Sequence, residues 1–211
     1  MKELLADPLV QGIGEIQGFS NVMPVYQHAP HLIDDLIASV TYARSIGKTI
    51  EGNAPGLFGK ELAAHIIAGG GHVSCHETTT KEETLEKLRN GVSVFMREGS
   101  SQRNMAECIR AITEEGVDSR RAILVSDDMV PEDLLKDGHM DDIIRRTIAR
   151  GIDPVEAIQM ATINPATHFG FTDIGVLAPG KRADLVVLSD LMRMKVDQVY
   201  LGGVKAAEQG K

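Results

Sequence analysis

The sequence lacks tryptophan, and its 3 tyrosines and 5 phenylalanines are few for a chain of 211 residues. So few aromatic side chains argue against a surface on which single-stranded nucleic-acid bases stack. Positive charge is also in deficit, because 22 Lys and Arg face 30 Asp and Glu, for a net charge of −8. Phosphate backbones and anionic lipids would repel such a chain, so we expect neither nucleic-acid nor membrane partners.

Long apolar runs are missing too. No stretch reaches the roughly 18 apolar residues of a transmembrane helix, and the acidic start MKELLADPLV does not read as a signal peptide. The two cysteines, Cys75 and Cys108, form no CxxC pair, which favours a reducing, cytoplasmic setting. With 43% hydrophobic residues the chain is expected to be globular rather than disordered.

Short β-type runs alternate with longer helical patterns along the first 150 residues. The pattern predicts strands over residues 9–15, 48–51, 72–76, 92–97 and 122–126, and helices over 29–45, 58–68, 81–89, 104–115 and 141–150. Thr79 or Thr80, followed by Glu82 and Glu83, predicts a capped helix start with an acidic first turn. Strands spaced in this way suit right-handed βαβ crossovers and a parallel sheet.

The pattern changes after Gly151. Asp153-Pro154 and Asn164-Pro165 each predict a helix start, and residues 183–188 and 196–201 predict two strands before a polar tail. We therefore expect an α/β protein: about five βα units, C-terminal helices and a small β appendage. The expected division is 1–170 for the βα units with their helices and 171–211 for the strands of the appendage. A full barrel needs roughly 250 residues, more than this chain supplies.

Polar side chains follow the predicted strands where active sites of parallel α/β folds gather. Glu15, His76, Glu98 and Asp127 follow four of them, and Asn53 follows Glu51 at the remaining one. Carboxylates and imidazoles around one rim suit a divalent metal that activates water. Each residue also has a structural interpretation: a buried, satisfied His76, a helix cap at Asp127, or a surface ion pair at Glu15.

The other histidines carry less signal. His28, His31, His65, His72 and His168 are expected to be surface or core residues, whereas His139, in a turn before a helix, suits a cap or a site equally.

The polar segments together resemble bacterial and archaeal adenine deaminases, metal-dependent members of the amidohydrolase superfamily. The resemblance covers nearly the whole chain, in order and at similar spacing. Its tail motif is shared by many amidohydrolases and is weakly specific, while the other segments together are much more specific. The matching segments are GE (14–15), EGNAPG (51–56), SCHETTT (74–80), REGS (97–100), SDD (126–128), the stretch 138–166 that begins GHMDDIIRR, and GVLAPGKRADLVVL (175–188).

The resemblance implies a (β/α)8 TIM-type barrel flanked by a small β domain, so that 1–170 would be a partial barrel and 171–211 strands of the small β domain. It also implies one or two divalent metals, Mn or Fe before Zn, that serve to hydrolyse adenine to hypoxanthine and ammonia. It assigns Glu15 as a bridging carboxylate, His76 as an imidazole ligand, and Asp127 as a ligand that helps to take the proton from water. Glu77 would position or protonate the purine. By the same resemblance, the adenine pocket would be shaped by Arg97, Glu98 and Ser100.

Two departures from the family pattern bear on activity. Asn53 replaces the histidine of the family's EGHAPG motif, and an amide oxygen is a poorer ligand than imidazole for transition metals. The family's HxH strand is absent, along with roughly the first three strands. We therefore expect a C-terminal portion that needs a missing N-terminal half, and either self-association or a partner that completes the barrel. The alternatives are a non-catalytic half-barrel scaffold or ligand-binding module, and an amidohydrolase acting on another cyclic amidine or amide.

Overall fold

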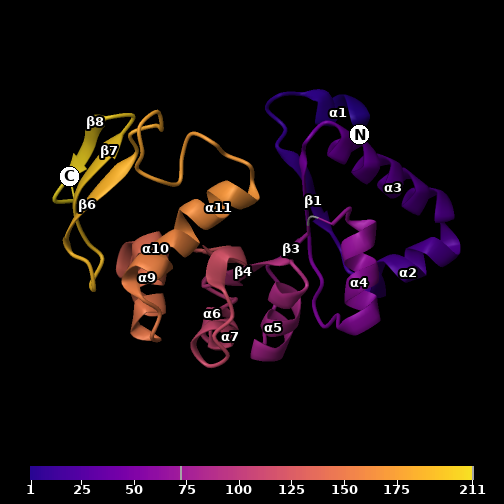
Figure 1. Ribbon diagram of the computed structural model, residues 1–211, viewed down its shortest axis with the longest axis horizontal. Coiled ribbons are helices and arrows are strands. Elements are labelled where there is room, and N and C mark those ends of the chain that lie inside the picture. The colour runs from indigo at the N-terminus through magenta and orange to yellow at the C-terminus, as the bar shows by residue number, and fades with distance from the viewer. Residues whose placement is uncertain (72, 211) are drawn as a thin grey trace. The chain divides into compact units, whose positions relative to one another are not determined.

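The computed structural model describes residues 1–71 and 73–210, and for residues 19–23 it describes the backbone alone. His72, predicted as a strand start, and Lys211, the end of the predicted β appendage, lie outside the described residues. The chain forms two compact units, Met1–Phe95 and Met96–Lys211, which are described separately (Figure 1). Within the described residues, no helix combines the length and apolar character that crossing a membrane requires.

The first unit alternates strands with helices, as the sequence pattern predicts. Its elements are α1 (Lys2–Ala6), β1 (Gly12–Ile16), α2 (Phe19–His28), α3 (Pro30–Ser45), β2 (Thr49–Gly52), α4 (Gly59–Ala68), β3 (Ser74–Cys75), α5 (Lys81–Arg89) and the start of β4 (Ser93–Arg97). Strands β1 and β2 pair in parallel, with Ile13 opposite Ile50, and β3 pairs in parallel with β4 through Ser74 and Ser93. The prediction of parallel βα units is confirmed here.

Apolar side chains from strands and helices bury one another in two clusters of this unit. One cluster joins α1, β1, α3 and β2, and its fully or nearly buried members are Leu5, Ile13, Ile16, Val40, Ala43 and Ile50. A second joins β3 and α4 to the loop after β2, through Ala54, Leu57, Leu62, Val73, Cys75 and Val92. Burying such side chains supplies about 1.5–3 kcal/mol each, which holds the strand ends at fixed positions.

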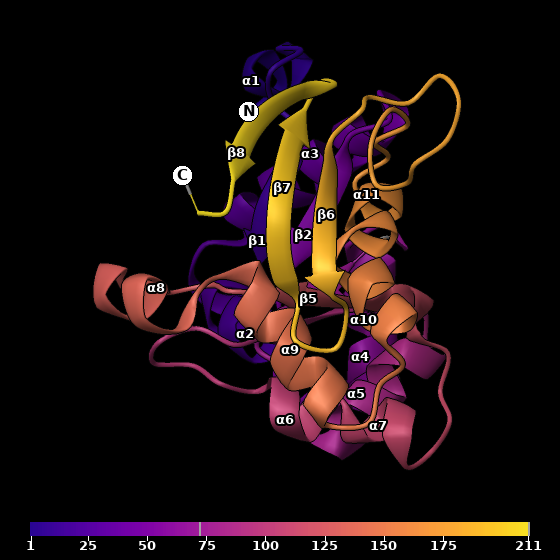
Figure 2. The same ribbon diagram turned by 90° about the vertical axis from the view of Figure 1, so that its left-hand side faces the viewer.

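The second unit begins with the end of β4 and finishes in an antiparallel meander. Its further elements are α6 (Met105–Cys108), α7 (Arg110–Thr113), η1 (Ser119–Arg121), β5 (Ala122–Val125), α8 (Pro131–Asp137), α9 (Met140–Ala149), α10 (Pro154–Ala161), α11 (Ile163–His168), β6 (Leu185–Asp190), β7 (Lys195–Leu201) and β8 (Val204–Glu208). Helices α9, α10 and α11 pack against β5. Figure 2 shows β6, β7 and β8 side by side in the C-terminal sheet, which is antiparallel.

Three details of the prediction are wrong. The helix expected over 104–115 is interrupted at Ile109, although the Ile109 backbone stays in the right-handed helical region. The pattern predicts two C-terminal strands before a polar tail, but part of that tail forms a third strand, β8, because Gly202 and Gly203 adopt positive φ angles of 57° and 83° and close a hairpin with β7. The strands do not all join one sheet: β1 pairs with β2, while β3, β4 and β5 form another ladder.

Candidate active site

Three strand ends of the first unit bring their polar side chains to one point. His76 Nε2 lies 3.4 Å from Glu15 Oε1 and 3.4 Å from Asn53 Nδ2. The backbone N–H of His76 donates to Asn53 Oδ1 at 3.1 Å, which fixes the orientation of the Asn53 amide. The structure therefore brings together Glu15, near the end of β1, with the residues that directly follow β2 and β3, as expected for the carboxyl ends of neighbouring strands.

Glu15 reaches this point through an unusual backbone conformation. Its φ is 53°, in the left-handed region that non-glycine residues rarely adopt, and its side chain stays 63% exposed. The His76 ring is 26% exposed, so neither the buried histidine nor a distant surface ion pair describes this pair. Asp127 in the second unit has the same kind of backbone, with φ of 58°. Strain of this kind clusters at functional sites, where it aims a side chain against local preference.

Side chains of helix α5 form hydrogen bonds with the loops after β2 and β3. Glu83 Oε1 accepts the N–H of Gly56 at 2.8 Å, and its Oε2 accepts the Lys87 ammonium at 3.1 Å. Lys87 is fully buried and also donates to Thr78 Oγ1 at 3.1 Å. Thr80 caps the helix by accepting Glu83 N–H, as predicted. Burial, with the Lys87 charge as a smaller cause, lowers the pKa of His65.

In the second unit the carboxylates at the strand ends are bound by arginines. Arg97 Nη1 lies 3.0 Å from Asp127 Oδ2, and the Arg97 side chain is only 9% exposed. Glu98, whose side chain is 5% exposed, receives Arg146 of α9 at 3.1 Å. Arg146 also binds Asp142 at 2.6 Å. The sequence around Arg146 does not predict its ion pair with Glu98. Only the ion pair with Asp142 could be predicted, because the two residues are four positions apart on one helix.

The loop after β4 packs tightly against the end of β5. A Cβ on Gly99 would collide with Asp128 Oδ1 and lie 2.5 Å from the carbonyl oxygen of Ser126, so only glycine fits there. Ser101 hydrogen bonds, first from its hydroxyl and then from its N–H, lower the pKa of Asp128. Ser100 Oγ accepts Val130 N–H at 2.9 Å. Ser100 therefore joins the loop after β4 to the segment after β5.

The structure also places Asp127, His139 and Glu77, the other polar positions singled out from the sequence. Asp127 is not a helix cap, since α8 begins after Val130 with Pro131 in its first turn. His139 precedes α9, but its side chain does not cap the helix; its Nε2 lies 3.1 Å from Ser126 Oγ beside the end of β5. Glu77 is half-buried. Four buried side-chain atoms have no hydrogen-bond partner among the described residues, and two of them, Arg97 Nε and Glu98 Oε2, belong to predicted site residues.

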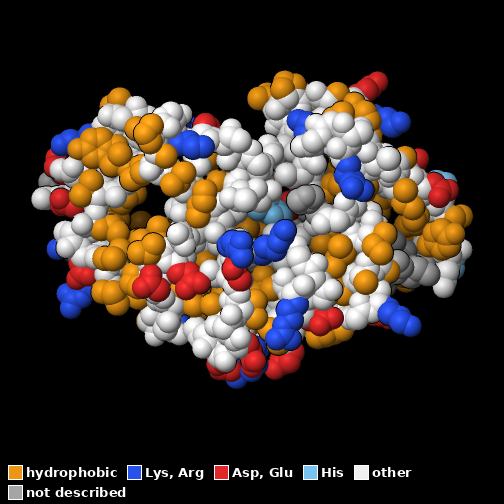
Figure 3. Space-filling view, in the orientation of Figure 1, with side chains coloured by type: hydrophobic (Ala, Val, Ile, Leu, Met, Phe, Trp, Pro, Cys, Tyr) orange, Lys and Arg blue, Asp and Glu red, His pale blue; other side chains and the backbone are white. Residues whose placement is uncertain are grey.

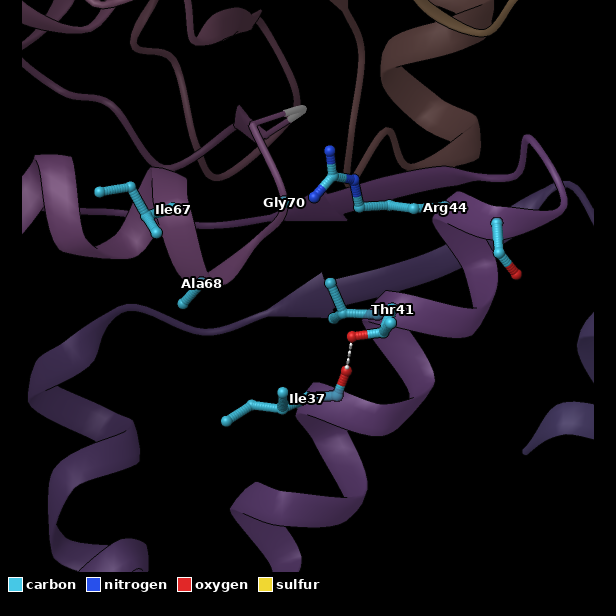
Figure 4. A pocket seen from close by; sticks show the side chains of 8 residues that line it. Ile37, Thr41, Arg44, Ile67, Ala68 and Gly70 are labelled. Atoms are coloured by element: carbon cyan, nitrogen blue, oxygen red, sulfur yellow. Dashed lines mark hydrogen bonds between the residues drawn. The ribbon is translucent and has the colours of Figure 1, made fainter.

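A cavity of about 480 Å³ lies elsewhere in the first unit, between α3 and the end of α4. Figure 4 shows Ile37, Thr41 and Arg44 of α3 facing Ile67 and Ala68 of α4 across it. Its lining contains no carboxylate and no histidine, so it is not the place for metal-assisted hydrolysis.

The geometry defines a class first: a βα protein in which carboxylate, amide and imidazole side chains stand together at the ends of parallel strands. A family model described as the amidohydrolase family matches residues 25–206, and the chain belongs to that family. β-Aspartyl dipeptidase from Fervidobacterium islandicum has the same fold, with a TM-score of 0.69 at 16% identity, over 99% of this chain and 61% of that one. An amidohydrolase from Thermotoga maritima superposes with a TM-score of 0.58 at 17% identity, over 94% of this chain and 63% of that one.

Curated relatives narrow the comparison. The chain is 67% identical to adenine deaminase 1 of Carboxydothermus hydrogenoformans over its whole length, which is 35% of that relative. It is 41% identical to adenine deaminase of Methanothermobacter thermautotrophicus, again over its whole length and 36% of the relative. The chain thus spans about a third of the length of these relatives, and the prediction that it corresponds to one portion of an adenine deaminase is confirmed.

Proposed function

We propose that the chain supplies part of the active site of a hydrolytic deaminase that converts adenine to hypoxanthine and ammonia. The observation that carries the proposal is the convergence of Glu15, Asn53 and His76 from three separate strand ends. The likeness to adenine deaminases suggests the substrate class, because the 67% identity extends over all 211 residues and so over the segments that hold the strand ends.

The donors of the first unit fit a divalent cation. Two ligands, each about 2.1 Å from a tetrahedral metal, lie roughly 3.4 Å apart. That is the separation of Glu15 Oε1 and His76 Nε2, which is longer than the roughly 2.7–2.9 Å of a charge-assisted hydrogen bond. Among the described residues no group of three His, Cys, Asp or Glu side chains forms a metal site on its own. We propose Asp127 as a further ligand, and Mn²⁺ or Fe²⁺, with Zn²⁺ as an alternative.

Asn53 favours a single ion at this position over a pair. Its Oδ1 accepts the His76 backbone N–H, so the oxygen that could bind a metal already has a donor. In this role Asn53 holds His76 in place and does not replace the imidazole of the family motif.

A bound divalent ion would lower the pKa of its bound water toward about 7 and so supply hydroxide at neutral pH. Asp127 would take the proton from that water, with its carboxylate oriented by Arg97 at 3.0 Å. Glu77 would donate a proton as ammonia leaves the tetrahedral intermediate. Arg97, Glu98 and Ser100 would shape the pocket around the flat purine.

A chimera tests this function directly. We would replace the matching third of the Carboxydothermus adenine deaminase with this chain, load the protein with Mn²⁺ or Fe²⁺ and measure ammonia release from adenine. Turnover that is lost in His76→Ala and Asp127→Ala is expected. A folded, metal-loaded chimera without turnover would refute the proposal and leave the alternative that Asn53 suggests, a half-barrel that only binds ligands. If the chimera hydrolysed another cyclic amidine or amide and not adenine, the proposed substrate would be wrong and the alternative amidohydrolase function would hold.

Partner and setting follow from the surface and the composition. Figure 3 shows hydrophobic side chains spread over one face of the molecule. In the chain as a whole, the exposed hydrophobic residues include Leu9, Ile67 and Leu135, which are 93%, 77% and 90% exposed. We propose that another polypeptide or a second copy covers part of this surface, in the cytoplasm, where thiols such as Cys75 and Cys108 stay reduced. Sedimentation of a stable monomer at micromolar concentration would contradict the association. The strands from 171 onward are proposed as part of a small β domain.

A further inference from the structure

The neighbouring strands β2 and β3 carry Asn53 and His76, yet as described they belong to different hydrogen-bonded ladders. Side chains connect them instead: Ser74 Oγ donates to Glu51, and Ala54 N–H donates to Cys75 Sγ at 3.3 Å. Together with the hydrogen bond from His76 N–H to Asn53 Oδ1, these contacts join the strand ends as far as Ala54. The loop residues farther on are held by different contacts, which come from α5.

Glu83 of α5 is placed to restrain both loops at once. One carboxylate oxygen accepts the N–H of Gly56, three residues after Asn53, at 2.8 Å. The other accepts the N–H of Thr79, three residues after His76, at 3.4 Å. A charged acceptor makes both hydrogen bonds stronger than a neutral one would. A glutamate at the third position of a capped helix ordinarily bonds back to the cap residue, but Glu83 reaches across to a second loop.

Lys87 completes the arrangement from one turn further along α5. Its ammonium is fully buried, which is rare for lysine unless a counter-charge is present, and it lies 3.1 Å from Glu83 Oε2. The same ammonium donates to Thr78 Oγ1 at 3.1 Å, on the loop after β3. The pair is therefore more than a helix-surface ion pair, because both partners bind residues that adjoin the candidate ligands.

We propose that the buried Glu83–Lys87 pair is a positioning device that fixes Asn53 against His76 and so sets the geometry of the metal-binding side chains. The role in metal binding rests on the proposed function, but the restraint on Asn53 and His76 can be measured without any metal. Neither residue touches the substrate or the metal in this proposal. Both act through the loops that they hold.

The test uses the double variant Glu83→Leu/Lys87→Met in the full chain. Removing one partner alone would leave a buried charge unpaired and risk unfolding, whereas replacing both with apolar side chains of similar size is often tolerated. The measurement is amide hydrogen exchange by NMR at Gly56, Thr79 and His76, with Ala43 in α3 as the reference for the rest of the unit. We expect exchange at the first three to accelerate at least about 10-fold relative to Ala43, because their hydrogen bonds lose a charged acceptor or its support.

Glu86→Gln is the matched control. Glu86 lies on the same helix and accepts the N–H of Gly59 at 3.1 Å, but Gly59 is farther along the loop from Asn53. This variant should change exchange at Gly59 and leave His76 unaffected. The proposal would be overturned if amide exchange at His76 in the double variant changed only as much as exchange at Ala43. It would also be overturned if exchange at His76 rose equally in Glu86→Gln. In either case the pair would have a structural role only.

A second measurement separates this proposal from the proposed function. In the chimera, Mn²⁺ affinity measured by calorimetry should fall roughly 10–100-fold in the double variant, as for other supports of metal ligands. If the unmodified chimera binds no Mn²⁺ while His76 exchange responds as expected, the positioning device stands and the metal assignment fails. Unchanged Mn²⁺ affinity in the double variant would overturn the positioning role itself.

Discussion

The two units place similar side chains at similar points of the βα pattern, but they treat them differently. In Met1–Phe95, Glu15 and His76 face each other at 3.4 Å, half-exposed and beyond ordinary hydrogen-bond distance. In Met96–Lys211, Glu98 and Asp127 are each bound by an arginine, at 3.1 Å and 3.0 Å. The first arrangement places a carboxylate and an imidazole side by side without a short hydrogen bond. The second pairs one oxygen of each carboxylate with an arginine, and Glu98 Oε2 stays buried without a hydrogen-bond partner among the described residues.

This difference separates two uses of charge. Arginine pairs with buried carboxylates fix side-chain orientation, since a guanidinium offers several donors in a rigid plane. A half-exposed imidazole beside a carboxylate stabilises the fold little and suits binding of a cation. The second unit is therefore expected to depend on its ion pairs for stability, and the first to depend on its strand-end pair for ligand binding.

The strongest test of this contrast is Arg146→Ala. The change leaves Glu98, only 5% exposed at its side chain, without the cation that lies 3.1 Å away. Breaking a buried pair by removing one partner costs about 3–5 kcal/mol, so the free energy of unfolding should fall by that order. Urea denaturation followed by far-UV circular dichroism measures it. Arg110→Ala, which removes an exposed arginine between Glu107 and Glu114, serves as the control and should have a far smaller effect. Equal effects would remove the distinction between buried and exposed pairs.

His76→Ala should show the opposite behaviour in the first unit. Its ring is 26% exposed and contributes no short hydrogen bond, so the free energy of unfolding should change by less than about 1 kcal/mol. Mn²⁺ affinity in the chimera should fall by more than about 100-fold, because even supports of ligands matter by roughly 10–100-fold. Calorimetric titration measures the affinity, and His31→Ala, an exposed histidine of α3, is the matched control. Unchanged affinity in His76→Ala would rule His76 out as a ligand.

The sequence predicts the alternation of elements well, because each strand is an apolar run that ends in polar residues. Strand boundaries shift by a few residues, as at β1, where exposed Leu9 belongs to the turn before the strand. Helix α2 is missed because Pro24 interrupts its pattern, although the helix continues through it. Helix α8 is missed because it is short and begins at a proline that reads equally well as a loop.

The candidate site is predicted in its residues and not in its partners. Motif spacing selects Glu15, His76 and Asp127, since polar residues after apolar runs mark strand ends. Long-range partners such as Arg146 for Glu98, 48 positions apart, leave no local signal. The role of Glu83 is hidden for the same reason, because its contact with Gly56 depends on how α5 packs. Positive φ at Glu15 and Asp127 has no sequence signature either, since neither residue is a glycine or an asparagine.

The smallest expected effect concerns an exposed pair of the second unit and its dependence on pH. Arg120, first through its side chain and then its backbone N–H, lowers the pKa of Asp118 from 3.8 to about 2. A depressed carboxyl pKa stabilises the folded state at pH values above 3.8, and this contribution is lost as pH falls from 3.8 toward 2.

Asp118→Asn keeps an oxygen to cap η1 but removes the charge. Since the Asp118 side chain is 57% exposed, the substitution should lower the free energy of unfolding by less than about 1 kcal/mol at pH 7. Urea titrations at pH 7 and near pH 2 should show the variant and the parent converging at the acid end. A gap that stays constant with pH would show that lost capping geometry, and not charge, causes the difference. A loss as large as that of Arg146→Ala would mean that pairing alone, without burial, determines how strongly the second unit depends on its arginines.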